Sequence, residues 1–522
     1  MPLPSSPRRA PADFIHGKWI DLAATDGRDA PSTALTSTNP AAPEEIIWQG
    51  APDIAHVDAA VAAARRAFPA WAALPGAERH QYLRRYQQVV RTNLDRIAGL
   101  ICDESGKTMA ESRFEANALI GKVDITLDPA GAWSRITDFD VPVSATRKGI
   151  NRFKPHGVMA VIGPFNFPAH LPNGHFIPAL AAGNTIVFKP SDKTPAVGQV
   201  IAELWEEVGL PPGVFNLVQG AADVAASLVS HDDLDSILFT GSWPVGRRIL
   251  EANLDRPGRI IALEMGGNNA AVVMDDADLR QAVVECVRAG FATTGQRCTC
   301  TRRVIVHERV IDQFRRAFIE TAKSLTIGPG RAEPGVFMGP VINEQTVEAV
   351  LEFQRRLTQR GGSVLLEAKR IDRPGHFVSP GIVEVDGSQY RAGDAEHDCE
   401  IFGPLVQLST CRDLNDAIAQ ANGTQYGLAA AIFTKRADDA ERFFREVRAG
   451  CINWNTGTAG ASSKLAFGGL GRSGNHRPAG AFSVDYCAYP VATMVESSGG
   501  ADVPPGMTFD DAWLSGASSP PA

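Results

Sequence analysis

Two cysteines that could do chemistry, Cys298 and Cys300, stand two residues apart in FATTGQRCTCTRR, residues 291–303. A thiol can act as a nucleophile, bind a metal or form a disulfide. A structural zinc site usually takes its four ligands as two close pairs, and the nearest candidates, Cys286 and His307, form no second close pair. Eight cysteines spread over 522 residues are not typical of a disulfide framework. We therefore expect no metal, and the disulfide interpretation is weakened, while the roles of the two thiols stay open on this evidence.

Three other polar residues stand at or just after the ends of apolar runs. Lys189 closes NTIVFK, Glu264 closes IIALE, and Asn166 lies in GPFNFP directly after VMAVI. Ligands of open α/β sheets bind at the carboxyl ends of the strands, so each residue is a candidate for a site. A stiffly held asparagine amide can stabilise an oxyanion. The carboxyl group of Glu264 is either a structural anchor or a general base, and the pattern leaves both open.

A glycine-containing turn gives a further clue. Gly241, Ser242 and Gly246 lie in FTGSWPVG, between an apolar run and a helical pattern. Backbone N–H groups at the start of a helix can face a phosphate. The spacing is not GxGxxG, so the usual dinucleotide fingerprint is missing and the turn alone is a weak signal.

The pattern of apolar positions indicates the elements that must hold these residues. Residues 53–127 repeat apolar side chains at spacings of three and four, which predicts helices. From Val158, short apolar runs alternate with helical segments, which predicts a mostly parallel sheet covered by helices. A second alternating block begins near Asn269, after the turn MGGNN. Two α/β domains would leave a crevice between them, a common place for a ligand.

Composition excludes several classes of protein. The chain has 44% hydrophobic and 21% charged residues, a formal charge of −8 and no long basic run, so nucleic-acid binding is not expected. No run approaches the roughly 18 apolar residues of a membrane span, and the N-terminus lacks the apolar stretch of a secretory signal. We expect a cytoplasmic protein that binds no membrane.

The order of the motifs resembles that of the aldehyde dehydrogenase superfamily. GPFNFP, FKPSD, FTGSWPVG, LEMGGNN, GQRC, EIFGP and FGGLGRSG follow one another at approximately the superfamily's spacing, from about Trp19 to Pro490. The resemblance implies an α/β fold with two Rossmann-type open-sheet domains and a small β oligomerisation element, in a homodimer or homotetramer. It assigns 1–137 and 155–263 to an NAD-binding domain, 138–154 and 481–496 to the oligomerisation element, 264–480 to a catalytic domain and 497–522 to a C-terminal tail.

The resemblance also distinguishes the two cysteines. Cys298 follows GQR, as the nucleophile of the superfamily does, whereas Cys300 matches no catalytic position. The implied reaction is attack of the Cys298 thiolate on an aldehyde, with Asn166 and the Cys298 backbone N–H as oxyanion donors. Hydride transfer leaves a thioester, which water activated by Glu264 hydrolyses. An unperturbed thiol with a pKa of ~8.5 is only a few per cent thiolate at neutral pH, so we expect the site to favour the anion.

NAD is the cofactor that the resemblance implies. Lys189 would bind the adenosine ribose, the turn at Gly241 would lie near the pyrophosphate, and Glu400 would position the nicotinamide ribose. The residues expected to bind NAD are Lys189, Ser191, Asp192, Gly241, Ser242, Gly246, Glu400 and Phe402.

Two residues depart from the superfamily pattern. Phe165 stands where tryptophan is common, which is a conservative aromatic change. Asp192 stands where a glutamate usually follows KPS. The longer carboxylate normally binds the ribose hydroxyls and repels a 2′-phosphate. The shorter Asp192 keeps NAD preferred and makes NADP less securely excluded.

Several local sequences, among them GQRCTCTRR and DYCAYP, resemble one branch of the superfamily whose substrate is an acidic semialdehyde. Such a substrate needs cationic or hydrogen-bonding partners. Arg297 adjoins the nucleophile, and His170 follows FNFP in a segment that lines the substrate tunnel in relatives. Ser462 and Ser463 lie in the loop before FGGLG. We expect these four residues to recognise the substrate carboxylates.

Other interpretations stay open. The chain could oxidise another aldehyde with NAD or NADP, transfer the acyl group to coenzyme A, or bind NAD without catalysis. Glu264, at the position of the hydrolytic base, argues against the coenzyme A reaction. The presence of a nucleophile, a base and an oxyanion donor argues against a silent protein. Arg302 and Arg303 begin a strand-like run and are expected to be solvated or to lie between domains.

Overall fold

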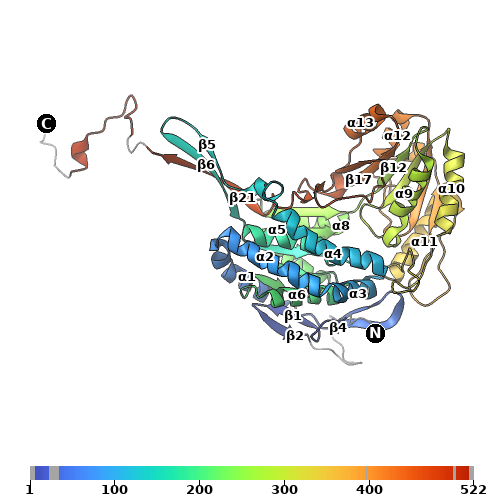
Figure 1. Cartoon of the computed structure of the whole chain (residues 1–522), viewed down its shortest axis with the longest axis horizontal. Helices are drawn as coiled ribbons and strands as arrows, with labels where there is room; N and C mark the ends of the chain where they lie inside the picture. Colours follow the sequence, from blue (N-terminus) through green and yellow to red (C-terminus); the bar gives the residue numbers. More distant parts are fainter. Residues whose placement is uncertain (1–5, 23–33, 396, 498–500, 516–522) are drawn as a thin grey trace. The chain divides into compact units, whose positions relative to one another are not determined.

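The computed structural model describes residues 6–22, 34–395, 397–497 and 501–515. The chain divides into two compact units (Figure 1). The larger comprises Met1–Ile136 and Pro155–Tyr489, and the smaller comprises Thr137–Lys154 and Pro490–Ala522. Among the described residues, no helix combines the length and the apolar character needed to cross a membrane.

The first sheet of the larger unit contains the predicted apolar runs from Val158 onwards. Five of its strands are parallel: β7 (Val158–Ile162), β8 (Thr185–Lys189), β9 (Phe215–Leu217), β10 (Ser236–Gly241) and β11 (Ile260–Met265). An antiparallel pair extends the sheet beyond β9: β1 (Ala12–Ile15) and β2 (Lys18–Asp21). The strand order is β11-β10-β7-β8-β9-β1-β2, so the chain reverses direction across the sheet between β7 and β10. Ligands bind outside the carboxyl ends of the strands at such a point.

Helices cover both faces of this sheet. The predicted helical stretch 53–127 is confirmed as α1 (Ala55–Ala73), α2 (Gly76–Thr92), α3 (Leu94–Ser105) and α4 (Met109–Thr126). The helices between and after the strands are α5 (His170–Ala182), α6 (Pro195–Val208), α7 (Ala222–Ser230) and α8 (Trp243–Glu251).

Successive side chains of a strand point to opposite faces, which explains how one strand serves two cores. Val187 of β8 packs with α1, α7 and α8 in one apolar cluster. Its neighbour Phe188 joins Phe176 of α5 and Phe215 on the other face. Both faces of the sheet are therefore buried, and its central strands read as continuous apolar runs.

The second sheet contains the second alternating block of the sequence. Its strands are β12 (Asn269–Val273), β13 (Thr301–His307), β14 (Ser363–Leu366), β15 (Gly381–Glu384), β16 (Leu405–Cys411), β17 (Ala429–Phe433) and β18 (Cys451–Trp454). The order is β14-β15-β16-β13-β12-β17-β18, with β14 antiparallel to its neighbour and the others parallel. Its helices are α9 (Leu279–Phe291), α10 (Ile311–Lys323), α11 (Glu344–Gln359), α12 (Leu414–Ala421) and α13 (Ala437–Glu446).

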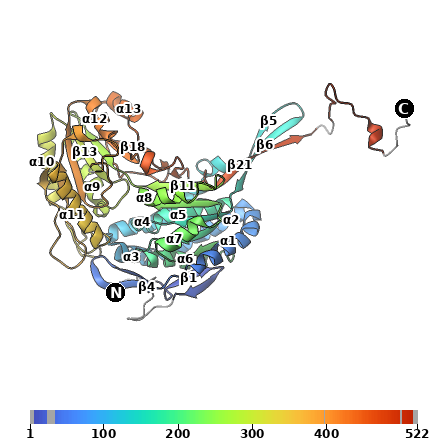
Figure 2. The same ribbon diagram turned by 180° about the vertical axis from the view of Figure 1, so that it is seen from behind.

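The view from behind shows the two sheets as separate layers of the larger unit, with α9 and α10 packed on the second (Figure 2). The turn after β11, residues 266–268, carries the chain from the first sheet to β12 of the second. Two small hairpin-like sheets complete the unit: β3 (Leu35–Asn39) with β4 (Ala42–Gly50), and β19 (Ala466–Phe467) with β20 (Ala479–Gly480).

The smaller unit is built on a three-stranded sheet. Its strands are β5 (Phe139–Pro142), β6 (Arg147–Pro155) and β21 (Ala488–Glu496), in the order β21-β6-β5. Residues 501–515 of the tail are exposed throughout. Pairing of this sheet across subunits stays a prediction, and the remainder of the predicted tail, 498–500 and 516–522, lies outside the described residues.

Candidate active site

A cavity of about 610 Å³ lies at the carboxyl ends of β7, β8, β10 and β11, where the strand order of the first sheet reverses. The second half of the chain closes the cavity with three segments. They are the turn 292–300 that contains Cys298, called the nucleophile turn after the predicted role of Cys298, the first turns of α11, and the segment from Glu400 to Phe402. The predicted site residues that line the cavity are Asn166, Lys189, Ser191, Asp192, Gly241, Ser242, Glu264, Cys298, Glu400 and Phe402. Gly246, Arg297, His170, Ser462 and Ser463 are not among the described residues that line it.

Cys298 occupies a turn between α9 and β13, and its side chain is half-buried at the cavity wall. The side-chain amide of Asn269 holds this turn by donating to the carbonyl oxygens of Cys298, at 2.7 Å, and Cys300, at 2.9 Å. Burial raises the pKa of the Cys298 thiol above its ordinary value, and the carboxyl groups of Glu400 and Glu264 raise it further. The chain's own groups therefore disfavour the thiolate, because an apolar wall and two acids both oppose an anion. The expectation that the complete site favours the anion stays a prediction. Cys300, by contrast, is fully buried.

The turn before Cys298 runs through two left-handed residues. Thr293 and Thr294 have φ of 54° and 53°. Positive φ is unfavourable for a β-branched residue and costs of order 1–3 kcal/mol each. Hydrogen bonds hold them there: the Thr293 N–H and hydroxyl donate to Oε1 of Glu111, both at 2.7 Å, and the Thr294 hydroxyl donates to the Gly339 carbonyl at 2.9 Å.

Arg297 is directed into the same network. Its Nε donates to the Thr293 hydroxyl at 2.8 Å, and its Nη2 donates to Oε1 of Glu111 at 3.1 Å. Within the described chain Nη1 makes no hydrogen bond, so one edge of the guanidinium stays available to another acceptor.

Asn166 connects the first sheet to the nucleophile turn. Its side chain is 6% exposed, and Nδ2 donates to the Gln296 carbonyl at 3.0 Å. An amide nitrogen carries two N–H groups, so the second is free to face the cavity. Phe165, the residue before it, packs edge-on against Phe402 with ring centroids 5.7 Å apart.

Glu264 lies in β11, one residue before the end of the strand. The backbone N–H of Ala479 donates to its Oε1 at 3.3 Å, and its buried Oε2 has no hydrogen-bond partner among the described residues. Burial raises the pKa of this carboxyl well above its ordinary value. A carboxyl group at the cavity wall with a raised pKa is a candidate acid or base.

Glu400 lies against the turn that joins the two sheets. The Gly267 N–H donates to its Oε1 at 3.1 Å, and a Cβ at Gly266 would lie 1.7 Å from its Oε2. A side chain at residue 266 would therefore displace the Glu400 carboxyl group from this position. Burial raises the pKa of Glu400 to about 7.

The cavity's other end presents a buried cation. The Lys189 ammonium donates to the carbonyl oxygens of Pro190 and Gly220, both at 2.7 Å, and burial lowers its pKa to about 8. Asp192 and Lys193 line the cavity beside it, with their charged groups 3.8 Å apart. Gly241 and Ser242 line it at the start of α8. Gly246 instead lets α8 approach β11, because a Cβ there would lie 2.4 Å from the Met265 sulfur.

The remaining residues predicted to bind substrate lie outside the cavity lining. His170 begins α5 and its imidazole Nδ1 is buried without a hydrogen-bond partner in the described chain. Burial lowers the pKa of His170 to about 4, so the ring is neutral at neutral pH. Ser462 is exposed and Ser463 half-buried, in the loop before β19.

Two arginines after the nucleophile were expected to be solvated or to lie between domains. The structure buries Arg302 and Arg303, at 2% and 1% exposed, so the first of these alternatives is wrong. Arg302 donates to the carbonyl oxygens of Gly295 and Arg297, at 2.7 and 3.1 Å, and so braces the nucleophile turn. An alternating apolar pattern cannot reveal such carbonyl partners, because they come from a turn.

Sequence analysis also missed Asn269 and Glu111, which hold the nucleophile turn from two sides. Asn269 belongs to MGGNN, which indicated only a turn. The sequence around Glu111 contains one recognisable pattern, because Thr108 and Glu111 have the spacing of a capping box. Both hydrogen bonds of that box are present at the start of α4. That signal predicts a helix start and says nothing of Thr293.

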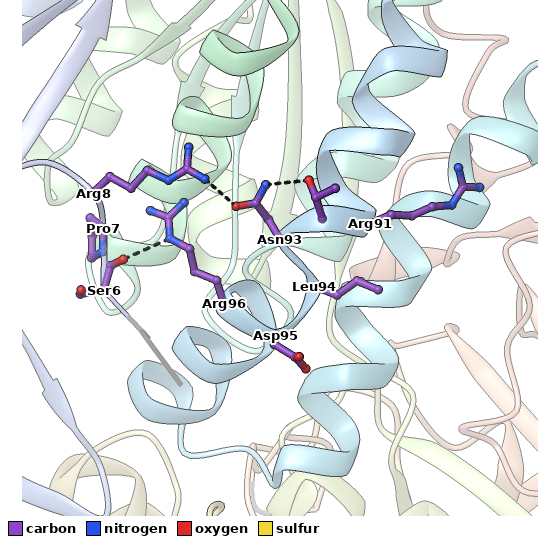
Figure 3. Close-up of a pocket in the computed structure, with 9 residues that line it drawn as sticks. Ser6, Pro7, Arg8, Arg91, Asn93, Leu94, Asp95 and Arg96 are labelled. Atoms are coloured by element: carbon purple, nitrogen blue, oxygen red, sulfur yellow. Dashed lines mark hydrogen bonds between the residues drawn. The ribbon is translucent and has the colours of Figure 1, made fainter. Parts of the chain in front are cut away.

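A second cavity, of about 590 Å³, lies at the junction of α2 and α3 and is lined by Arg8, Arg91 and Arg96 (Figure 3). Arg8 donates to Asn93 at 2.9 Å and to Glu207 at 2.8 Å, and Arg96 is paired with the buried Glu203. These contacts tie the N-terminal segment to α6. The lining contains none of the predicted site residues, so we place the active site in the first cavity.

A thiol, a carboxyl group and an amide line one cavity at the switch point of an open α/β sheet, which is the arrangement expected of an enzyme with a cysteine nucleophile beside a nucleotide-type crevice. The chain belongs to the aldehyde dehydrogenase family, whose model matches residues 28–490. It is accordingly an oxidoreductase that acts on aldehydes.

Similar proteins cover nearly the whole chain. An N-succinylglutamate 5-semialdehyde dehydrogenase of Chromobacterium violaceum is 42% identical over 92% of this chain and 96% of its own length. An enzyme of the same name from Novosphingobium aromaticivorans is 40% identical over 91% of this chain and 99% of its own. The crystal structure of PnpE in complex with nicotinamide adenine dinucleotide is 33% identical, with a TM-score of 0.86 over 95% of this chain and 99% of that one.

The different burial of the two cysteines generates a prediction. Cys298→Ala should lower aldehyde oxidation by at least about 10³, because the thiol at the cavity wall is removed. Cys300→Ala should keep kcat within about threefold, since its thiol is fully buried and does not line the cavity. Steady-state formation of NADH measures both, and a larger loss in Cys300→Ala than in Cys298→Ala would reverse the choice of nucleophile.

Proposed function

We propose that the chain oxidises N-succinylglutamate 5-semialdehyde to N-succinylglutamate with NAD as the oxidant. The observation that carries this proposal is the convergence of Cys298, Glu264 and Asn166 on one cavity that also presents Lys189 and Glu400. Relatives about 40% identical over more than nine-tenths of the chain, which carry the name of this activity, support the choice of substrate.

The donor groups of the cavity fit NAD. Lys189, Ser191 and Asp192 offer a cation, a hydroxyl and a carboxylate to the hydroxyls of the adenosine ribose. The start of α8 at Ser242 offers backbone N–H groups to the pyrophosphate. Glu400 and Phe402 would hold the nicotinamide ribose and ring. Bound NAD would supply a hydride acceptor and a positively charged ring.

The chain's own groups account for the first half-reaction. The Cys298 sulfur attacks the aldehyde carbon, and the oxygen becomes an oxyanion. The free N–H of Asn166 and the Cys298 backbone N–H are the donors within reach of that oxygen. Burial and two neighbouring carboxyl groups raise the pKa of Cys298, so the positively charged ring of bound NAD would help to stabilise the thiolate.

The second half-reaction requires a base. After hydride has left, Cys298 carries a thioester, and water must attack it. Glu264 lines the same cavity, and its Oε2 has no hydrogen-bond partner among the described residues. The ionised carboxylate can therefore accept a proton from that water. A raised pKa makes this carboxylate a stronger base than an ordinary one.

Thioester hydrolysis should therefore depend on pH. Glu264 stays protonated up to its raised pKa and can accept a proton only above it, so hydrolysis should accelerate as pH rises through that value. Glu264→Gln should remove this rising limb and slow hydrolysis by about 10²–10⁴. Single-turnover decay of the acyl-enzyme across the neutral range measures the effect. An unchanged limb in Glu264→Gln would assign the base to another group.

Cofactor choice should respond to Asp192. The carboxylate of Asp192 repels a 2′-phosphate, whereas the neighbouring Lys193 ammonium, 3.8 Å from it, would attract one. Asp192→Ala should raise kcat/KM for NADP relative to NAD by about tenfold, or roughly 1.4 kcal/mol. The double variant Asp192→Ala with Lys193→Ala should lose most of that gain. An unaltered ratio in the single variant would remove Asp192 from the cofactor site.

Recognition of the substrate carboxylates is assigned to Arg297, His170, Ser462 and Ser463. Arg297 is the cation among them, and its Nη1 edge is free although Glu111 and Thr293 hold the rest of the guanidinium. His170 can act only as a neutral hydrogen-bonding group, because its pKa is lowered to about 4. The two serines can add hydroxyl donors from the loop before β19.

Substrate preference tests the proposal directly. N-succinylglutamate 5-semialdehyde should exceed succinate semialdehyde, glutamate semialdehyde and a neutral aliphatic aldehyde in kcat/KM by about a hundredfold, or roughly 2.7 kcal/mol. Arg297→Ala should lower kcat/KM for the acidic aldehydes about tenfold more than for the neutral one. Comparable rates on all four aldehydes would withdraw the substrate assignment and leave the aldehyde chemistry intact.

We also propose that the protein works as a homodimer or homotetramer in the cytoplasm on a small acidic aldehyde, without nucleic-acid or membrane partners. The family membership supports an oligomer. The formal charge of −8 over 522 residues supports the absence of a polyanionic partner.

A further inference from the structure

The first turns of α4 carry two acids four residues apart, the half-buried Glu111 and the buried Glu115. Residues four apart lie on one face of a helix. The side chain of Glu111 is 16% exposed and that of Glu115 is fully buried. Neither residue lines the cavity, and neither has a role in the proposed reaction.

Glu111 holds the turn that leads to Cys298. Its Oε1 accepts hydrogen bonds from the Thr293 N–H, the Thr293 hydroxyl and Nη2 of Arg297, at 2.7, 2.7 and 3.1 Å. Thr293 is one of the two left-handed residues of that turn. One carboxylate oxygen therefore fixes the backbone at the point where its conformation is least favourable.

Glu115 holds the segment that follows Asn166. Its Oε1 accepts from the backbone N–H groups of Ala169 and His170, at 2.9 and 3.0 Å. These are N–H groups at the start of α5, which have no partner inside that helix. Its Oε2 is paired at 2.5 Å with Lys107, whose ammonium lies 3.3 Å from the ring centroid of Phe167.

The two acids thus reach two loops that come from different sheets and carry the two residues proposed to act together in the first half-reaction, Asn166 and Cys298. Asn166 follows β7 of the first sheet, and Cys298 precedes β13 of the second. Two direct contacts join the loops: the hydrogen bond from Asn166 to the Gln296 carbonyl at 3.0 Å, and the Arg297 guanidinium over the Phe167 ring, 5.5 Å from its centroid. Side chains make both contacts, so a connection that holds the two backbones is an additional way to set the separation of the loops.

We infer that Glu111 and Glu115 are positioning residues, and that this face of α4 sets the register between the oxyanion amide of Asn166 and the thiol of Cys298. The inference rests on the proposed roles of those two residues. A helix is a suitable spacer because its internal hydrogen bonds fix the distance between residues four apart. The acids act through the backbone and touch no reacting atom.

Two conservative variants of Glu111 separate the effect of side-chain length from the effect of charge. Glu111→Gln keeps the length of the side chain and an oxygen that can accept from Thr293, but it loses the charge. Glu111→Asp keeps the charge, but it shortens the side chain by one methylene group and withdraws the oxygen from Thr293. Positioning requires reach, so the expected order of activity is wild type, then Glu111→Gln, then Glu111→Asp.

The first measurement is the pre-steady-state burst of NADH, which reports the step that needs both Asn166 and Cys298. The burst rate should fall by less than about fivefold in Glu111→Gln and by about 10–100-fold in Glu111→Asp, the scale on which small misplacements act. Alkylation of Cys298 by iodoacetamide needs no oxyanion donor and should stay within about threefold in both. Equal burst rates, the reverse order, or a parallel loss of alkylation would overturn the inference.

The second measurement does not depend on activity. Hydrogen–deuterium exchange of the peptide 291–300 should be faster in Glu111→Asp than in wild type or Glu111→Gln, while peptides from β7 and β8 stay unchanged. An unaltered rate in 291–300 would contradict the inference. A wild-type enzyme that oxidised no aldehyde would defeat the proposed function alone, because the exchange measurement would still decide whether Glu111 anchors the turn.

The matched control is Asp124→Asn on the same helix, which removes an exposed acid paired with Arg84 on the surface. It should leave the burst rate and the exchange of 291–300 unchanged. If Glu111→Asp lost NAD affinity or had a lowered Tm, and the control did neither, the loss of activity in Glu111→Asp would reflect general damage. The burst rate of Glu111→Gln would then be the test of the inference. In that case, a burst rate in Glu111→Gln that fell more than about tenfold would overturn the inference.

Discussion

The conformation of the nucleophile turn is the constraint on which the rest of the site depends. Thr293 and Thr294 hold positive φ, where β-branched residues are strained, and the turn would relax if it were left to itself. Hydrogen bonds from the surrounding structure offset the backbone strain of the two threonines. Asn269 holds the Cys298 carbonyl, and Arg302 holds the Gly295 and Arg297 carbonyls. Because several hydrogen bonds hold the strained turn at once, we expect the Cys298 thiol to have one orientation rather than several.

Burial is the second physical feature of the site, and it destabilises the charged form of each ionisable side chain there. The cavity places Glu264, Glu400 and Lys189 where water is scarce, and burial moves the pKa of each towards its neutral form. The two acids also oppose the ionisation of Cys298. In the proposed reaction, the reactivity of the Cys298 thiol would therefore depend on the positively charged ring of bound NAD.

Several structural findings were predictable because they depend on short-range patterns. The four helices within 53–127 follow from a repeat of three and four, and the central strands follow from apolar runs buried on both faces. The cavity residues at the carboxyl ends of strands follow from the topology that such an alternation implies. The burial of Arg302 was not predictable, because its partners are carbonyl groups of a turn whose shape depends on left-handed residues.

The sequence by itself determined the alternation of strands and helices, the family, and the residue types that lie at the cavity, because each is encoded within a few adjacent positions. Only the tertiary structure decided which of those residues are free to act. Arg297 is adjacent to Cys298 in sequence, yet Glu111, 186 residues earlier, holds its guanidinium. The pKa values of Cys298 and Glu264 likewise depend on groups brought together from both sheets. Electrostatics and hydrogen bonding act through space, so a pattern along the chain could not contain them.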